Sequence, residues 1–299
     1  MSKDAATSGD IPDPPESLGQ GPIIRAACIQ MRGGLSRQAN INDAVHLIEM
    51  AARDGATLIS TPEMTNVVDR KPARLLADLP TEENLDEIEV FAETAHRLGV
   101  WLHAGSFAVR MPGPGQPPKA ANRAFLFAPD GRVTARYDKL HMFDVSLPHG
   151  ETWRESALFE PGNQLATPHM GAARLGLSIC YDVRFPALYR HMAQDGADIF
   201  CIPAAFTRQT GRAHWSVLLR ARAIECGAFV LAAAQGGDHE DGRETWGHSM
   251  IIDPWGTVLA SLDHDAPGHV VADLDLREVA TARQRIPNLT LSHPALSGA

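Results

Sequence analysis

The feature that most constrains the fold of this chain is an alternation of short apolar runs with longer amphipathic segments. Apolar runs of strand length occur at residues 23–31, 57–61 and 100–110. Between them, residues 40–52 place apolar side chains at helical spacing, and we expect a second helix from Thr81, whose hydroxyl can cap it. Strands that alternate with amphipathic helices are typical of α/β folds, so we predict layered helices and sheets.

The rest of the chain repeats this pattern after one irregular stretch. Residues 142–164 show no period and are expected to be a long surface loop. Residues 258–262 and 270–274 are expected to form a hairpin. The further predicted strands are 122–127, 133–141, 173–180, 199–204, 228–234 and 249–252. The further predicted helices are 185–193, 214–226 and 276–284.

Composition divides the chain into a short leader and one domain. Residues 1–21 are polar and rich in Gly, Ser and Pro, and we expect them to be a disordered leader without a folded role. No linker interrupts residues 22–299, so we predict a single domain there. A domain of this length can bury a large core.

Charge and cysteine content exclude several classes of protein. The 299 residues carry 27 Lys and Arg against 36 Asp and Glu, a net charge of −9, so neither nucleic acid nor an anionic membrane is an expected partner. No apolar run approaches the roughly 18 residues of a membrane span, and the start lacks the apolar segment of a signal peptide. The four cysteines, Cys28, Cys180, Cys201 and Cys226, have no paired spacing, which indicates reduced thiols and a cytoplasmic location.

Two apparent sources of chemistry can be set aside. The segment Gly247-His248-Ser249-Met250-Ile251 is similar to the G-x-S-x-G turn of serine hydrolases. The β-branched Ile251 would crowd that turn, so we expect Ser249 inside a strand. The 13 histidines include neither an H-E-x-x-H motif nor Cys/His pairs at zinc spacing, and we expect no metal and no cofactor.

Cys180 is the strongest candidate for a nucleophile. It follows a buried strand, and Pro186 then occupies a preferred place in the first turn of a helix. Backbone N–H groups and the positive end of a helix would lower the pKa of a thiol at this position. The alternative is a buried structural cysteine, which is our interpretation of the other three cysteines.

Glu63 and Lys139 lie in comparable places. Glu63 follows the strand 57–61 and Pro62, and Lys139 lies towards the end of the strand 133–141. Ligands of open α/β sheets bind at the carboxyl ends of strands. A carboxylate, an amine and a thiol together there would supply a base, an oxyanion partner and a nucleophile. Taken singly, each charge has the alternative interpretation of a solvated residue, and spacing alone does not bring the three together.

Three separate segments resemble the catalytic segments of the nitrilase (carbon–nitrogen hydrolase) superfamily. They are TPEM around Glu63, YDKLHMFDV around Lys139 and ICYDVRFPALYR around Cys180, in the order of that family. The segments AHWSVLLRARAIE, AAAQGG and GHSMIIDPWGTVLA resemble its Nit branch. The resemblance covers about residues 22–290 and implies a four-layer α-β-β-α sandwich that associates through a dimer interface.

The resemblance also implies a role for each of these residues. Cys180 would attack an amide carbonyl and form a thioester with release of ammonia. Glu63 would accept and return protons and would activate water, while Lys139 and the backbone N–H of Tyr181 would hold the oxyanion.

A second glutamate is implied in the loop after the lysine. Glu151 and Glu155 both qualify, and Glu155 has the spacing from Lys139 that resembles the Nit branch. We therefore choose Glu155, with a role in orienting Lys139 or the substrate rather than in proton transfer.

Arg184, Phe206 and Thr207 are the predicted substrate-binding residues. Arg184 lies just after the nucleophile, and Thr207 follows a strand that ends in Phe206. Both are placed to meet a carboxylate, which a guanidinium binds through two hydrogen bonds. The alternative for Arg184 is a role in an interface or in fixing a loop. His214 and Trp215 would line the pocket or pack in the core or an interface.

These features predict a cytoplasmic thiol amidase that acts on a small acidic amide and forms a homodimer or a higher homo-oligomer. Within the Nit branch, the resemblance implies deaminated glutathione as the substrate. The alternatives are ω-amidase activity on α-ketoglutaramate, nitrilase or N-carbamoyl amidase activity, and a non-catalytic binding member of the fold. The presence of all three catalytic residue types counts against the last alternative.

Overall fold

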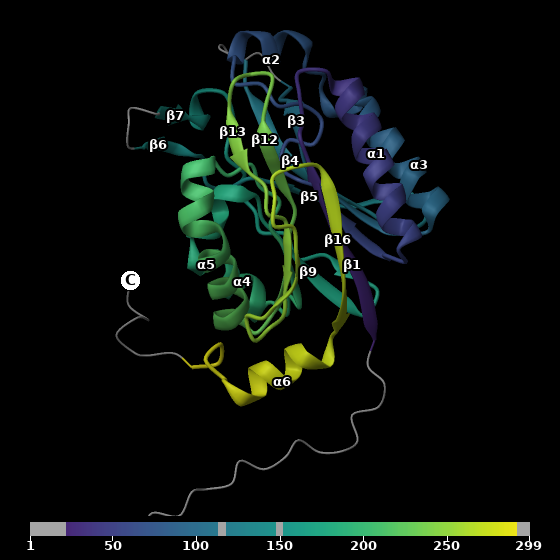
Figure 1. The fold of residues 1–299 in the computed structure, drawn as a ribbon, viewed down its shortest axis with the longest axis vertical. Coiled ribbons are helices and arrows are strands. Elements are labelled where there is room, and N and C mark those ends of the chain that lie inside the picture. Colours follow the sequence, from purple (N-terminus) through teal and green to yellow (C-terminus); the bar gives the residue numbers. More distant parts are fainter. Residues whose placement is uncertain (1–21, 113–117, 148–151, 292–299) are drawn as a thin grey trace, which may run out of the picture.

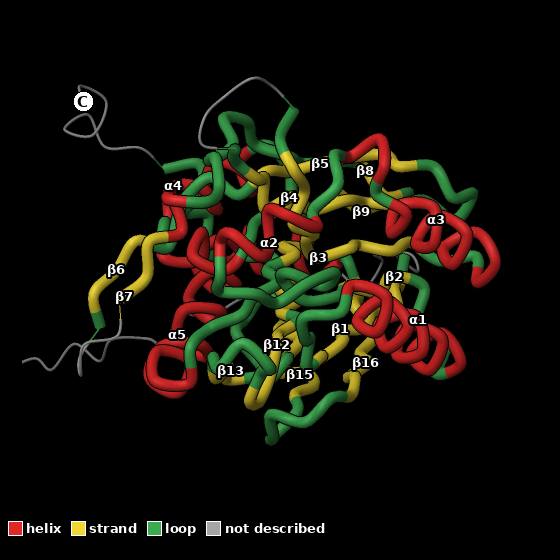
Figure 2. Tube along the Cα trace, turned by 90° about the horizontal axis from the view of Figure 1, so that it is seen from above, coloured by secondary structure: helices red, strands yellow, loops and turns green. Residues whose placement is uncertain are grey.

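Two β-sheets lie face to face at the centre of the molecule, and helices cover the outer face of each (Figure 1). The computed structural model describes residues 22–112, 118–147 and 152–291. Helices α1 (Arg37–Arg53) and α3 (Asp86–Leu98) lie outside one sheet, and α4 (Pro186–Gln194) and α5 (Arg208–Cys226) lie outside the other (Figure 2). The expected α-β-β-α layers are confirmed. The predicted leader lies outside the described residues.

The first sheet combines strands from both ends of the chain. Its strands are β1 (Ile23–Met31), β2 (Leu58–Ser60), β3 (Trp101–Arg110), β4 (Ala120–Phe127), β5 (Val133–Asp138), β12 (Ala234–Asp238), β13 (Glu244–Trp246) and β16 (Gly268–Asp275). They follow the order β13-β12-β1-β2-β3-β4-β5, and β16 also pairs with β1. Apolar side chains of this sheet, such as Ile29 and Phe107, pack with Ile48 of α1 and Phe91 of α3 in one core cluster.

The second sheet comes from the C-terminal half alone. Its strands are β8 (His169–Met170), β9 (Ala173–Leu177), β10 (Ile199–Cys201), β11 (Phe229–Ala232), β14 (Met250–Ile252) and β15 (Val258–Ser261). They follow the order β15-β14-β11-β10-β9-β8. Leu58 and Leu126 of the first sheet share a buried cluster with Leu177 and Phe200 of the second, so apolar side chains fill the space between the sheets.

The predicted hairpin of residues 258–262 and 270–274 is wrong. Strand β15 pairs with β14 in the second sheet, whereas β16 pairs antiparallel with β1 in the first. The β16 register extends from Ile23↔Asp275 to Gln30↔Gly268 and gives partners to backbone groups along the whole edge of β1. Strand β16 therefore pairs with a strand that is distant in the sequence, and not with β15 across a local turn.

The helix expected from Thr81 begins later than predicted. A short 3-10 turn, η1 (Glu82–Asn84), comes first, and α3 starts at Asp86. The Thr81 hydroxyl accepts a hydrogen bond from the side chain of Asn84 at 3.0 Å and caps no backbone group of the turn. Glu82 meanwhile binds Arg123 and so faces the sheet. The remaining helices are α2 (Pro72–Asp78) and α6 (Arg277–Arg285).

The described parts of residues 142–164 contain regular structure in place of the expected loop. Strands β6 (Asp144–Ser146) and β7 (Thr152–Arg154) pair antiparallel and project from the body of the molecule in Figure 1. The 3-10 turn η3 (Glu155–Ala157) follows directly. Short strands with exposed alternate residues leave little periodicity for a sequence pattern to detect. Within the described ranges, none of the helices has the length and apolar character that a bilayer span requires.

Candidate active site

The carboxyl ends of strands from both sheets meet at one place. In the first sheet, β2 leads to Glu63 and β5 ends directly before Lys139. In the second sheet, β9 leads to the 3-10 turn η4 (Cys180–Arg184). All three side chains line the same cavity. The structure therefore brings together the carboxylate, the amine and the thiol that spacing alone left apart.

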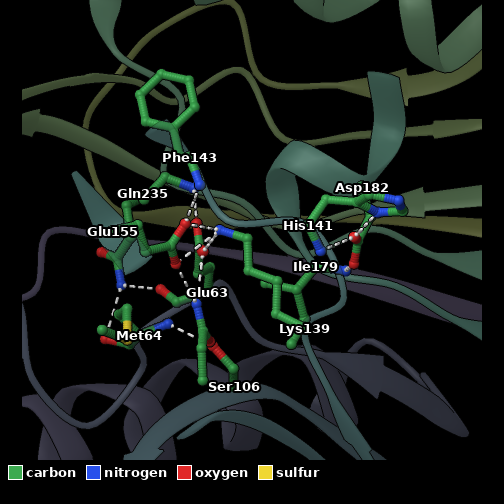
Figure 3. Close-up of polar contacts among 12 residues, drawn as sticks. Glu63, Met64, Ser106, Lys139, His141, Phe143, Glu155, Ile179, Asp182 and Gln235 are labelled. Carbon is green, nitrogen blue, oxygen red and sulfur yellow. Dashed lines mark hydrogen bonds and ion pairs between the residues drawn. The ribbon is translucent and has the colours of Figure 1, made fainter. Parts of the chain in front are cut away.

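Lys139 lies between two carboxylates (Figure 3). Its ammonium donates to Glu63 Oε1 at 2.9 Å and to both oxygens of Glu155 at 2.9 Å. Lys139 is 2% exposed and Glu63 is 5% exposed, so the charges lie in a region with little water. Buried charges of this kind are stable only when they are paired and hydrogen-bonded, and here one cation serves two anions.

Neutral donors complete the hydrogen bonds of both carboxylates. The Asn122 side-chain amide donates to Glu63 Oε1 at 2.9 Å and to Glu155 Oε1 at 3.3 Å. The N–H of Ala205 donates to Glu63 Oε2 at 2.9 Å, and the N–H of Phe143 donates to Glu155 Oε2 at 2.6 Å. These donors could not be predicted from the sequence, because backbone groups leave no signal in it and Asn122 lies in a strand that is mostly apolar.

Cys180 is held in a left-handed turn against Glu63. Its φ of 50° lies in a region that residues other than glycine seldom adopt, and its N–H donates to the carbonyl of Pro203 at 2.8 Å. The thiol is hydrogen-bonded to the Glu63 carboxylate, the same carboxylate that accepts from the N–H of Ala205. Glu63 is therefore in contact with the proton that a cysteine nucleophile must lose.

The charges of the site keep the thiol protonated and Glu63 ionised. Burial raises the pKa of Cys180, and the Glu63 carboxylate raises it further, while Lys139 lowers it by less. Burial also acts to raise the pKa of Glu63, but Lys139 and hydrogen bonds hold it below the usual 4.5. The pKa of Lys139 would fall on burial, yet Glu155 and Glu63 hold it well above 10.5.

The predicted lowering of the thiol pKa by a helix end is therefore wrong. The turn that begins at Cys180 is a 3-10 turn of five residues, too short for the dipole of an α-helix. Burial of the sulfur and the carboxylate in contact with it raise the thiol pKa instead, and a thiolate would be a third negative charge beside a single ammonium.

Asp182 joins the chain segment after β5 to the segment after β9. One oxygen of this fully buried carboxylate accepts from the N–H and the ring Nδ1 of His141, at 3.0 and 2.7 Å. The other accepts from the Tyr137 hydroxyl at 2.7 Å and from the N–H of Ile179 at 2.9 Å. Figure 3 shows His141, Ile179 and Asp182 beside the lysine. The carboxylate therefore fixes the positions of the lysine and the cysteine relative to each other.

Close packing fixes the loop that carries Glu63. A Cβ at Gly105 would lie 1.9 Å from the carbonyl oxygen of Thr61, so only glycine lets β3 approach the end of β2 this closely. The next residue, Ser106, accepts a hydrogen bond from the N–H of Met64 at 2.9 Å, and Met64 itself has a φ of 56°. The backbone on both sides of the glutamate is thus held by neighbouring strand β3.

Nearly the whole chain matches one protein family. The sequence profile of the carbon–nitrogen hydrolase family matches residues 25–284. The chain belongs to this family. It is accordingly a hydrolase that acts on carbon–nitrogen bonds other than peptide bonds. A Synechocystis protein named deaminated glutathione amidase is 41% identical over 270 residues, which cover 88% of this hydrolase and 96% of that protein.

Solved structures share the sandwich of this hydrolase. The Caenorhabditis elegans NitFhit protein superimposes with a TM-score of 0.82 at 33% identity, over 93% of this chain and 67% of that one. Nit3 of Saccharomyces cerevisiae, a member of branch 10 of the nitrilase superfamily, superimposes with a TM-score of 0.78 at 25% identity, over 91% and 96%. The fold is therefore the nitrilase-type four-layer sandwich.

A cavity of about 230 Å³ opens at the site of this hydrolase. The predicted site residues that line it are Glu63, Lys139, Glu155, Cys180, Tyr181, Arg184, Phe206 and Thr207. Glu151 lies outside the described residues. Trp215 is buried in the core, where its indole N–H donates to the carbonyl of His248 at 2.9 Å. In the part of the chain that the structure describes, no three His, Cys, Asp or Glu side chains are arranged to hold a metal ion.

The predicted substrate residues form one wall of the cavity, but they differ in what they offer. The Arg184 guanidinium lies 5.2 Å from the ring centre of Phe206 and 5.9 Å from that of Tyr181. Thr207 is less free, because its hydroxyl caps α5 by accepting from the N–H of Thr210 at 3.3 Å. Nη1 of Arg184 lies 3.3 Å from Nδ1 of His214, and the guanidinium has no carboxylate partner among the described residues, so of the three it is the group best suited to an anionic ligand.

Proposed function

We propose that this hydrolase cleaves an amide bond of deaminated glutathione through a thioester on Cys180, with Glu63 and Lys139 as the other catalytic residues. The observation that carries the chemistry is that one buried carboxylate, Glu63, contacts both the ammonium and the thiol. The substrate is supported by the Synechocystis relative, which bears the name deaminated glutathione amidase.

In the first half-reaction, the Glu63 carboxylate accepts the thiol proton as the sulfur of Cys180 attacks the amide carbonyl carbon. The carbonyl oxygen becomes an oxyanion, which the ammonium of Lys139 and the backbone N–H of Tyr181 stabilise. A preorganised donor of this kind lowers the barrier by about 3–4 kcal/mol. Glu63 then returns the proton to the nitrogen as the C–N bond breaks, which leaves a thioester and a free amine.

In the second half-reaction, water attacks the thioester carbonyl while Glu63 accepts one of its protons. The intermediate collapses to the carboxylic acid, and the sulfur of Cys180 regains its proton from Glu63. Glu155 stays outside these transfers because both of its oxygens accept from Lys139. It acts by keeping Lys139 charged and oriented.

The leaving group follows from the structure of the substrate. In deaminated glutathione a keto group replaces the α-amino group of glutathione, so its carbon–nitrogen bonds are two secondary amides. Cleavage at the γ-glutamyl amide yields 2-oxoglutarate and cysteinylglycine. Ammonia, the amine expected from the sequence, is released only from a primary amide such as α-ketoglutaramate.

A substrate panel tests this proposal. We expect the purified protein to show its highest kcat/KM on deaminated glutathione, measured as release of 2-oxoglutarate. The comparison substrates are α-ketoglutaramate, an N-carbamoyl amino acid and a simple nitrile. Preference for α-ketoglutaramate would make the protein an ω-amidase with the same catalytic residues. Absence of turnover on the whole panel would contradict the proposed activity.

The pH dependence of kcat/KM tests whether Glu63 is ionised and Cys180 is protonated in the free enzyme. Glu63, whose pKa is lowered, stays a base until the pH falls below its usual 4.5, and Cys180, whose pKa is raised, stays a thiol above pH 9.0. We therefore expect a kcat/KM that is flat between about pH 6 and pH 8.5, with loss only towards strongly acidic pH. A rising limb with an apparent pKa near 8.5 would instead show a thiolate that forms without Glu63.

Assembly and location belong to the same proposal. We infer a homodimer or a higher homo-oligomer, since Val217 and Ile224 of α5 are 68% and 47% exposed on the outer layer. A cytoplasmic location is supported by the four cysteines, all of which are free thiols. Light scattering that gave the mass of a monomer would contradict the first inference.

A further inference from the structure

The walls of the cavity carry more positive charge than the acidic composition of the chain would suggest. Its carboxylates are all paired: Glu63 and Glu155 with Lys139, Asp69 with Arg74, and Glu244 with Arg208. Three of its arginines, Arg70, Arg154 and Arg184, have no carboxylate within 4.0 Å among the described residues. In a chain with a net charge of −9, unpaired guanidinium groups at one cavity point to a ligand with more than one anionic group.

Two arginines of the cavity lie against one aromatic ring. The guanidinium of Arg70 lies 5.8 Å from the ring centre of Trp153, and that of Arg243, which is paired with Asp241, lies 5.3 Å from the same ring. Nη1 of Arg154 donates to the carbonyls of Val145 and Trp153 at 3.0 and 2.7 Å, which holds this side chain in place while it keeps its charge. We call Arg70, Trp153, Arg154 and Arg243 the Trp153 cluster. All four members line the cavity, and all of them come from loops or from the β7 strand.

Arg184, the third arginine without a carboxylate partner in the described part of the chain, lies in another part of the wall. Arg184 packs on Tyr181 and Phe206, and the ring of Phe143 separates it from the Trp153 cluster. The centre of the Phe143 ring is 5.1 Å from that of Tyr181 and 6.2 Å from that of Trp153. A cation therefore lies at each end of this row of rings, an arrangement that suits a substrate with a carboxylate at each end.

We assign the two ends of the substrate from the proposed roles of Cys180 and Glu63. Arg184 belongs to the turn that begins with Cys180, the residue that would hold the acyl group. Arg70 belongs to the segment that follows Glu63, the residue that would protonate the leaving amine. On this assignment the acyl end faces Arg184, and the amine end faces the Trp153 cluster.

We propose that the Trp153 cluster, through Arg70 and Arg154, is a second carboxylate subsite that binds the glycine carboxylate at the amine end of the substrate. This inference rests on the proposed function. Deaminated glutathione has a carboxylate at each end, whereas α-ketoglutaramate has only the one at the acyl end. The subsite is thus a determinant of specificity between two substrates that share the same chemistry.

The test compares three substrates in the variant Arg70→Gln. They are deaminated glutathione, its derivative with a carboxamide in place of the glycine carboxylate, and α-ketoglutaramate. We expect Arg70→Gln to lower kcat/KM about tenfold for deaminated glutathione, mainly through KM, because one charge-assisted hydrogen bond is lost. For the other two substrates, kcat/KM should change by less than about twofold. Arg184→Gln should lower kcat/KM for all three.

Lys71→Gln is the matched control, because it removes the neighbouring exposed cation, which does not line the cavity. This variant should leave kcat/KM unchanged for all three substrates. If Arg70→Gln lowers kcat/KM equally for all three substrates, or leaves kcat/KM for deaminated glutathione unchanged, the proposed subsite is wrong while the proposed function stands. If the wild-type protein does not cleave deaminated glutathione, the proposed function fails and the subsite fails with it.

Discussion

Cys180→Ala should abolish turnover and leave the fold intact. The thiol is the group placed to attack the substrate, and neither Glu63 nor Lys139 can replace it in forming a thioester. Removal of an enzyme nucleophile lowers kcat by about 10⁴-fold or more. Alanine keeps the backbone conformation and loses one buried sulfur, so the free energy of unfolding should fall by about 1 kcal/mol. The measurement is product release together with thermal unfolding.

Cys201→Ala is the control for this prediction. Cys201 is also a fully buried thiol, but it belongs to β10 and does not line the cavity. Burial raises its pKa to about 12, which keeps it unreactive. We expect this variant to lose some stability and no activity. If Cys180→Ala kept more than about 1% of the wild-type rate, a thioester on this residue would be excluded.

The parts of the fold that depend on local residues could be predicted from the sequence. Apolar alternation and helical spacing locate the strands that precede Glu63, Lys139 and Cys180, because each element buries one of its own faces. The partners of β15 and β16 could not be predicted in this way. Their pairing depends on which strand, distant in the sequence, has an edge with unpaired backbone groups. A local turn pattern contains no information about that strand.

The candidate site shows the same division between local and non-local information. The three charged or nucleophilic residues belong to recognisable segments, but the state of the thiol depends on how close the carboxylate lies. Burial and a carboxylate in contact with the sulfur of Cys180 together reverse the pKa shift that the helix position predicts. Asn122 and Asp182 were missed because a single buried polar residue shows its role only through partners from other strands.

Lys139→Met should have the second largest effect, on activity and on stability together. The substitution keeps an unbranched side chain and leaves Glu63 and Glu155 buried with no cation between them. An uncompensated buried charge costs about 3–5 kcal/mol, and the free energy of unfolding should fall by about that amount at pH 7. The oxyanion donor is lost as well, so kcat should fall by about 10²–10³-fold beyond any effect of unfolding.

The pH dependence of stability separates this explanation from simple loss of packing. In the variant, burial and mutual repulsion raise the pKa of a carboxyl above its value in the unfolded chain, so the folded state takes up a proton as the pH falls. The Tm of Lys139→Met should therefore rise between pH 8 and pH 5. In the wild type Glu63 has a lowered pKa, so its contribution to stability has the opposite sign and is lost as the pH falls.

Two further variants complete the test of Lys139. Adding Glu155→Gln to Lys139→Met removes one of the two uncompensated charges, so it should restore part of the lost stability at pH 8 and none of the activity. Lys71→Met removes an exposed lysine and should change the Tm by little at any pH. If Lys139→Met were as stable as the wild type at pH 8, or if the second substitution destabilised it further, the three charges would not form the coupled unit that their 2.9 Å contacts describe.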